Sequence, residues 1–195
     1  MTLILHHAAD FASTIVRLAL EELGLPHVIA LADIEGGALT TSEYRQVNPV
    51  GLIPALETDH GPMFETGAIL LWLVDQTGRL GPGPQDPDRP AFLSWLFFTS
   101  NALHQAALAM FYPHRPAGEA NTDAARAVAH DQITLRLGLI EAMIAARAPR
   151  WLSPEHPGVL GFYIGILVRW LILLPPEPYG IEIDAFPHLK AVLAA

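Results

Sequence analysis

The sequence contains no cysteine among its 195 residues. This absence excludes disulfide scaffolds, zinc–thiolate sites and a cysteine nucleophile. Any thiol chemistry that this chain carries out must therefore use a thiol that a ligand brings in.

Basic residues are scarce, with 11 Lys and Arg against 20 Asp and Glu, so the formal net charge is −9. No cluster of basic residues supplies the footprint that nucleic-acid binding needs, and we expect no nucleic-acid partner. The chain also lacks low-complexity tracts, and 51% of its residues are hydrophobic, so intrinsic disorder is not expected. The first residues lack the features of a signal peptide, which predicts a cytoplasmic protein.

No hydrophobic run is long enough for a membrane span. The segment 159–174 is almost wholly apolar, but its 16 residues fall short of the roughly 20 that a bilayer requires. Arg169 also interrupts it. We expect this segment to form a buried core helix, with no membrane contact.

Residues 1–79 have the alternating pattern of a small α/β domain. Strands are expected at 2–5, 27–31, 54–57 and 63–64, and helices at 11–23, 41–47 and 66–77. Residues 80–90 contain four prolines and two glycines and are predicted to form a linker.

The pattern of residues 91–195 is helical throughout. Long helices are expected at 91–111, 122–147 and 157–174, and Pro187 stands at the start of a closing helix. The sequence thus predicts an α/β domain followed by an all-helical one.

Pro54 lies at the start of a predicted strand, in the segment "NPVGLIPALE". Proline cannot donate to a strand ladder, so it belongs at an edge, a strand start or a bulge. Two interpretations stay open. The proline either starts the strand in trans, or forms a cis bond that leaves the Ile53 backbone free to pair with an extended peptide.

Glu65 and Thr66 directly precede an apolar helix. A helix N-terminus attracts carboxylates, Thr66 is a suitable N-cap, and Glu65 could receive an ammonium group. Together they would recognise the zwitterionic end of an amino acid. The alternative is an ordinary N-cap beside a solvated carboxylate.

These segments together resemble the glutathione S-transferase family. "LALEELGLPH" is similar to that family's first helix, "NPVGLIPALE" and "FETGAIL" to its glutathione-binding signature, and "PHLKAVL" to its closing helix. The resemblance implies a thioredoxin-like N-terminal domain, a C-terminal helical bundle and glutathione as co-substrate.

The resemblance also implies roles for four residues. Pro54 would be cis, and the Ile53 backbone would pair with the cysteinyl part of glutathione. Glu65 and Thr66 would hold the γ-glutamyl end. The family often has Lys or Gln at the position of Leu52, which helps to hold the glycyl carboxylate, and Leu cannot do so.

The group that would activate the thiol departs from the family pattern. Alignment with cysteine-type members places Ala12 at the cysteine and Ser13 at the following serine. Ser13 is therefore the expected catalytic hydroxyl, with Thr14 as the second choice. The tyrosine-type position falls near His6 or His7, which lie on opposite faces of a strand and cannot chelate one metal. We expect no metal site.

The resemblance places the second-substrate pocket in the helical domain. His104 matches a histidine that cysteine-type members place beside the thiol, and Tyr112 could line the same pocket. For each residue the alternative is a purely structural role within the helices.

The expected function is transfer of glutathione to a small apolar electrophile, with a role in detoxification. The alternatives are a glutathione-binding or protein-interaction module with little catalysis, and a glutathione-dependent isomerase. The electrophile itself is not specified by the sequence. A homodimer is expected, because the helical domain is rich in apolar surface and family members usually pair through the helix after the linker.

Overall fold

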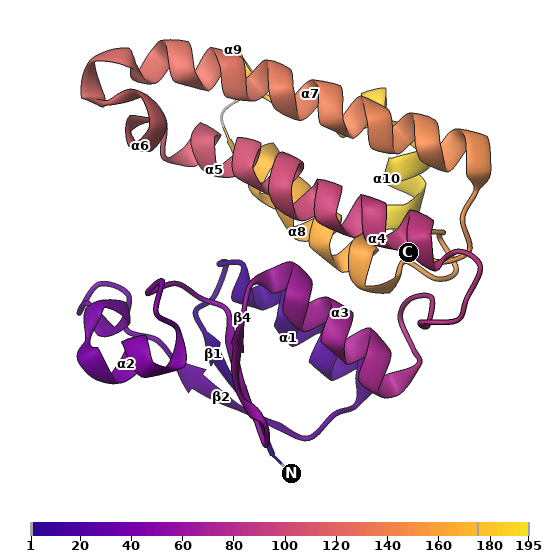
Figure 1. The fold of residues 1–195 in the computed structure, drawn as a ribbon. Helices are drawn as coiled ribbons and strands as arrows, with labels where there is room; N and C mark the ends of the chain where they lie inside the picture. Colours follow the sequence, from indigo (N-terminus) through magenta and orange to yellow (C-terminus); the bar gives the residue numbers. More distant parts are fainter. Residues whose placement is uncertain (1, 175, 195) are drawn as a thin grey trace. The chain divides into compact units, whose positions relative to one another are not determined.

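The computed structural model describes residues 2–174 and 176–194 (Figure 1). The chain divides into two compact units, Met1–Asp86 and Pro87–Ala195. The boundary falls within the segment predicted as a linker. We call them the sheet unit and the helical unit, and describe each by itself.

The sheet unit is built on four strands in the order β2-β1-β3-β4. Their bounds are β1 Leu3–His7, β2 His27–Leu31, β3 Ala55–Thr58 and β4 Gly61–Phe64. Strands β1 and β2 are parallel, whereas β3 is antiparallel to both β1 and β4. This mixed sheet is the thioredoxin-like arrangement that the family resemblance implies.

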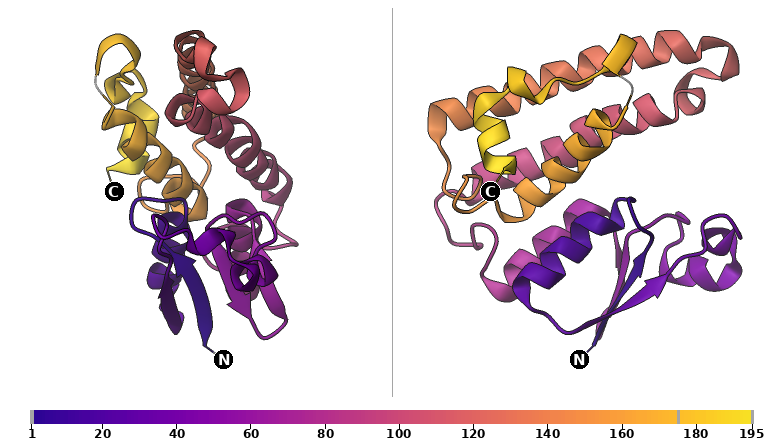
Figure 2. Two further views of the ribbon diagram at one scale, coloured as in Figure 1. Left: turned by 90° about the vertical axis from the view of Figure 1, so that its left-hand side faces the viewer. Right: turned by 180° about the vertical axis from the view of Figure 1, so that it is seen from behind.

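Helices cover both faces of the sheet. Helices α1 (Ser13–Leu23) and α3 (Thr66–Thr77) pack against each other on one face, and the short α2 (Ser42–Val47) lies on the other, after the 3-10 turn η1 (Ala38–Thr40) (Figures 1 and 2). Alternate residues of β1 are buried, with Leu5 fully enclosed. The core of this unit therefore lies between the sheet and the α1–α3 pair.

Two details of the sheet unit refine the sequence prediction. Helix α1 begins at Ser13 rather than at residue 11, because Phe11 N–H donates to the Ala8 carbonyl (3.3 Å) and closes a turn before the helix. The Ile53–Pro54 bond is cis, and β3 begins after it at Ala55. The Ile53 backbone thus lies just outside the strand.

The helical unit begins with a rod made of α4 (Arg89–Phe98), the π-helical turn η2 (Thr99–Leu103) and α5 (His104–Phe111). The predicted helix 91–111 is therefore interrupted by a π turn. The other main helices are α7 (Thr122–Arg147), α8 (Gly158–Ile172) and α10 (Pro187–Leu193). Short segments connect them: α6 (His114–Ala117), η3 (Glu119–Asn121), α9 (Pro176–Tyr179) and η4 (Ile183–Ala185).

Helix α8 is the buried core helix that its composition predicts. Ten of its residues are buried. A Cβ atom at Gly161 would lie 2.6 Å from Pro157 Cβ, so only glycine fits against the residue that precedes the helix. In residues 2–174 and 176–194, no helix combines the length and apolar character needed to cross a membrane.

Candidate functional site

The register of the sheet brings three distant segments to one end of the sheet unit. Ala55 pairs with both His6 and Phe64. Because β3 is antiparallel to β1 and β4, the residues before β3 lie beside those that follow β1 and β4. The end of the sheet therefore collects Ile53–Pro54, the loop 8–12 with the start of α1, and Glu65 with the start of α3.

The loop before β3 exposes apolar side chains at the position where the family often has a cation or amide. Ile53 and Pro54 are buried, whereas 54% of Leu52 and 53% of Val50 are exposed. The departure predicted at Leu52 is thus visible on the surface of this loop.

Helix α2 and the residue after it, Asn48, hold this loop through hydrogen bonds that the sequence did not predict. The Tyr44 hydroxyl donates to the Leu52 carbonyl (2.6 Å), and so does Asn48 Nδ2 (2.7 Å). The Val50 N–H donates to Asn48 Oδ1 (3.0 Å). Burial raises the pKa of Tyr44 to about 12, so its hydroxyl keeps its proton. Tyr44 is the one aromatic residue of the segment 41–47, and this was the only sequence signal for the contact.

Glu65 occupies the N-cap position of α3, and Thr66 is the first helical residue, which corrects the prediction that Thr66 is the N-cap. Glu65 has φ +71°, an uncommon conformation for a residue other than glycine, and its carboxylate makes no capping hydrogen bond. The side chain is exposed, whereas Thr66 is buried. Uncommon backbone conformations cluster at ligand sites, and this one leaves an exposed carboxylate beside a helix N-terminus.

Ser13 is fully buried, and the hydroxyl forms three hydrogen bonds. It accepts from the Ala8 N–H (3.1 Å), donates to the Ala8 carbonyl (3.1 Å) and lies 3.0 Å from His7 Nδ1. A serine hydroxyl has one donor and two acceptor positions, so these contacts use all of them. The catalytic role of Ser13 stays a prediction, and it requires the hydroxyl to exchange a partner for the thiol.

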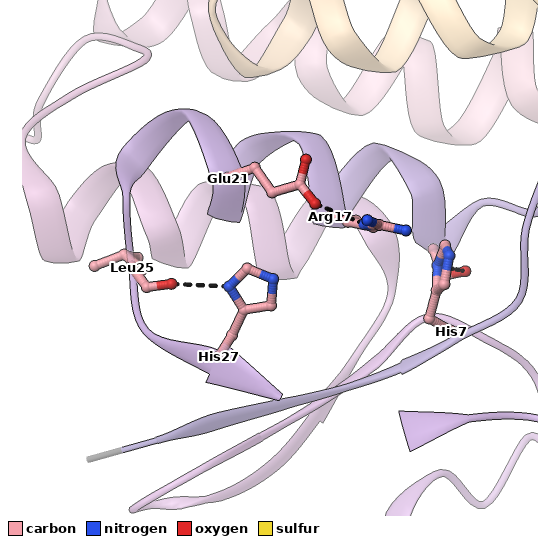
Figure 3. A network of polar contacts seen from close by, with 6 residues as sticks. His7, Arg17, Glu21, Leu25 and His27 are labelled. Carbon is pink, nitrogen blue, oxygen red and sulfur yellow. Dashed lines mark hydrogen bonds and ion pairs between the residues drawn. The ribbon is translucent and has the colours of Figure 1, made fainter. Parts of the chain in front are cut away.

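The environment of His7 favours its neutral form. Burial lowers the pKa of His7, and the nearby Arg17 guanidinium lowers it further, against a smaller opposing effect of Glu21. Arg17 Nε donates to Glu21 Oε1 (2.7 Å), and Figure 3 shows the Arg17 side chain extending from Glu21 toward His7. The His7–Ser13 pair is therefore an uncharged contact at neutral pH.

His6 lies on the opposite face of β1, as predicted. Its Nε2 atom lies 2.8 Å from Glu57 Oε1, and its ring meets the edge of Tyr44 with 5.3 Å between ring centroids. Both adjacent histidines thus have internal partners. In the described part of the chain, no three His, Asp or Glu side chains gather as a metal site would.

Within the helical unit, His104 Nδ1 lies 2.9 Å from the Tyr163 hydroxyl. Burial lowers the pKa of His104 to about 4, so it is neutral at pH 7. The Arg115 guanidinium lies over the Tyr112 ring, with its central carbon 3.9 Å from the ring centroid. The pocket roles of His104 and Tyr112 stay predictions, and Tyr163 is a partner that sequence reasoning missed.

Comparison with known proteins places these features in a family. Residues 12–76 match the model of the N-terminal domain of glutathione S-transferase. The disulfide-bond oxidoreductase YfcG of Escherichia coli is 34% identical over 96 residues, which are 45% of this chain and 44% of that protein. The chain thus matches less than half of the length of that relative. Glutathione S-transferase GstB of the same species is 29% identical over 150 residues, which are 74% of this chain and 70% of that protein.

Solved structures extend the similarity to both units. A glutathione transferase from Burkholderia graminis, with two glutathione molecules bound per subunit, is 27% identical and has a TM-score of 0.83, covering 99% of this chain and 82% of its own. A glutathione transferase family member from Pseudomonas fluorescens, also with two glutathione molecules bound, is 25% identical and has a TM-score of 0.83. The match covers 98% of this chain and 86% of that one. Residues 12–76 are thus a glutathione S-transferase N-terminal domain, and the chain is similar to glutathione transferases over almost its whole length.

Proposed function

We propose that this protein is a glutathione transferase that conjugates glutathione to a small apolar electrophile. The observation that carries the proposal is the sheet register, which brings Ile53–Pro54, Glu65–Thr66 and the start of α1 to one end of the sheet. These are the segments that would contact the cysteinyl part, the γ-glutamyl part and the thiol of one glutathione molecule.

The γ-glutamyl end would be bound at the start of α3. The exposed Glu65 carboxylate pairs with the ligand ammonium, while the Thr66 hydroxyl and the free N–H groups of the first turn receive its carboxylate. The Ile53 backbone pairs with the cysteinyl part as an added strand would. Leu52 offers the glycyl carboxylate no charge, so affinity rests mainly on Glu65, Thr66 and Ile53.

The thiol would lie at the N-terminus of α1, where the helix dipole stabilises an anion. The thiol loses its proton to solvent, and the thiolate sulfur forms a bond to an electrophilic carbon. The displaced electron pair leaves with a departing group or is protonated on the product. Ser13 is the predicted hydroxyl donor to the thiolate. Its burial favours a second role, in which it holds the loop 8–12 in place.

His104 and Tyr112 are the proposed residues of the second-substrate pocket, as the family resemblance implies. A homodimer and a cytoplasmic location complete the proposal. Helix α7 exposes Val128, Leu135 and Leu139, an apolar row at helical spacing that a second copy could cover. Light scattering at micromolar concentration is expected to give the mass of a dimer, and a monomer mass would contradict this part.

Turnover of a panel of electrophiles, with and without glutathione, tests the function. We expect glutathione-dependent conjugation of at least one apolar electrophile, such as a chloronitrobenzene or an enone. Retention on glutathione resin without any turnover would support the alternative of a binding module. Turnover of a double-bond isomer without net consumption of glutathione would support an isomerase.

A further inference from the structure

The Leu52 carbonyl accepts two side-chain hydrogen bonds immediately before the proposed glutathione contact. The Tyr44 hydroxyl and Asn48 Nδ2 approach it at 2.6 Å and 2.7 Å. A carbonyl oxygen has two lone pairs, so both are used. Neither donor belongs to the sheet ladder: Tyr44 lies in α2, and Asn48 is the residue that follows this helix.

The two donors are themselves held firmly. Tyr44 is buried, and its ring contacts His6, whose Nε2 atom pairs with Glu57 of β3. Asn48 is 2% exposed, and its N–H donates to the Tyr44 carbonyl (2.9 Å). The position of the Leu52 oxygen is thus set by groups anchored in the core of the sheet unit.

The Leu52 carbonyl and the Ile53 N–H belong to the same peptide group. The peptide group is planar, and in its trans form the C=O and N–H bonds point in opposite directions. Among residues 2–174 and 176–194, the only cis peptide bond is Ile53–Pro54. The Leu52–Ile53 peptide is therefore trans. Fixing the direction of the Leu52 C=O bond therefore fixes the direction of the Ile53 N–H bond.

We propose that Tyr44 and Asn48 are positioning residues that aim the Ile53 N–H at the cysteinyl carbonyl of glutathione, acting through the Leu52 peptide plane. This inference rests on the proposed function for its ligand. Neither side chain touches glutathione in this scheme. Their effect on binding comes from pre-organising a backbone donor, which removes the cost of ordering it when the ligand arrives.

Tyr44→Phe tests the proposal because it removes the hydroxyl and keeps the ring against His6. We expect the dissociation constant for glutathione, measured by calorimetry on the full chain, to rise about fivefold. Tyr179→Phe is the matched control, since it removes a tyrosine hydroxyl that donates to the Asp123 carbonyl (3.2 Å) in the helical unit. The control is expected to bind glutathione as the wild type does.

Asn48→Asp is the second variant. It keeps an oxygen for the Val50 N–H but turns the other donor into an acceptor that faces the Leu52 oxygen. We expect a larger loss of affinity, more than tenfold, because two oxygen atoms then repel each other at the position of a hydrogen bond.

Residual dipolar couplings of the Ile53 amide in ¹⁵N-labelled protein report the N–H direction without any ligand. We expect this coupling to change in Tyr44→Phe and in Asn48→Asp, while couplings in β1 and α3 stay as in the wild type. Unchanged Ile53 couplings, or a lower unfolding temperature with unchanged glutathione affinity, would overturn the proposal. Failure of the wild type to bind glutathione would instead overturn the proposed function, and the couplings would still decide the positioning role.

Discussion

Each unit of the protein has a histidine whose Nδ1 atom contacts a hydroxyl, but the two pairs differ in the sequence separation of their members. His7 and Ser13 are six residues apart, and the bond is 3.0 Å long. His104 and Tyr163 are 59 residues apart, and their bond is 2.9 Å long. The first pair shapes one loop of the sheet unit, whereas the second joins α5 to α8 in the core of the helical unit.

The same pairing of a histidine with a hydroxyl therefore holds a loop at the candidate site in one unit and joins two helices in the other. In the sheet unit, the buried polar groups of Ser13, Tyr44 and Asn48 all hold loops at the same end of the sheet. In the helical unit, the long-range bonds of His104 and Glu141 connect helices. Changes at these sheet-unit contacts should therefore alter glutathione binding as well as stability, whereas changes at these helix-joining contacts should alter stability and leave glutathione binding as it is.

The largest expected effect is a loss of stability at acidic pH, caused by protonation of His104. The pKa of His104 is lowered by burial to about 4, below its usual 6.5, so the unfolded chain binds a proton more readily than the folded one. The free energy of unfolding should fall as the pH drops from 6.5 toward 4, by about 2–3 kcal/mol at pH 4.5. His104→Asn keeps an acceptor for Tyr163 and cannot titrate. Between pH 7.5 and 4.5, its free energy of unfolding, measured by urea titration, should therefore fall by about 2–3 kcal/mol less than that of the wild type. An equal loss in both proteins would show that this pair is not the acid-sensitive contact.

Ser13→Ala, in the sheet unit, should have the next largest effect on stability. It removes the buried partner of the Ala8 N–H and of His7 Nδ1, while the Ala8 carbonyl keeps its bond from the Phe11 N–H. The free energy of unfolding should fall by about 2 kcal/mol. Ser42→Ala, at an exposed position of the same unit, is the control and should change it by less than about 0.5 kcal/mol.

The ultraviolet titration of bound glutathione separates the two roles of Ser13. If its hydroxyl also donates to the thiolate, the apparent pKa of the bound thiol will rise in Ser13→Ala. If Ser13 only holds the loop, the two titration curves will coincide while stability still falls.

The smallest expected effect is at Glu141, whose carboxylate caps α10 from α7. It accepts from the Leu189 N–H (2.8 Å) and the His188 N–H (3.1 Å). Burial raises the pKa of Glu141, but these hydrogen bonds outweigh it and lower the pKa below its usual 4.5. Glu141→Gln should cost about 1 kcal/mol of stability above pH 5, and the difference should vanish as the pH falls below the folded-state pKa. A difference that persists at pH 3 would mean that charge is not involved.

The sequence predicted those helices and turns whose residues form a recognisable pattern along the chain. The helix 122–147 has the bounds found in the structure, and the Pro54 and Glu65–Thr66 signals mark the end of the sheet where three segments meet. The contacts of Tyr44 and Tyr163 could not be predicted, because their partners lie on separate elements and leave no periodic signature. The burial of Ser13 was missed because the groups that enclose its hydroxyl belong to the end of β1 and to the loop after it, where the bonding follows no periodic pattern.

Calorimetric titration of glutathione into Glu65→Ala, the wild type and Glu35→Ala tests the central claim most directly. Glu65 lies at the start of α3, and Glu35 is an exposed carboxylate elsewhere in the sheet unit. The account predicts that Glu65→Ala raises the dissociation constant 30- to 100-fold, about 2–3 kcal/mol, because the ligand ammonium loses its charged partner. Glu35→Ala should match the wild type. Affinity of Glu65→Ala within a factor of two of the wild type would contradict the account.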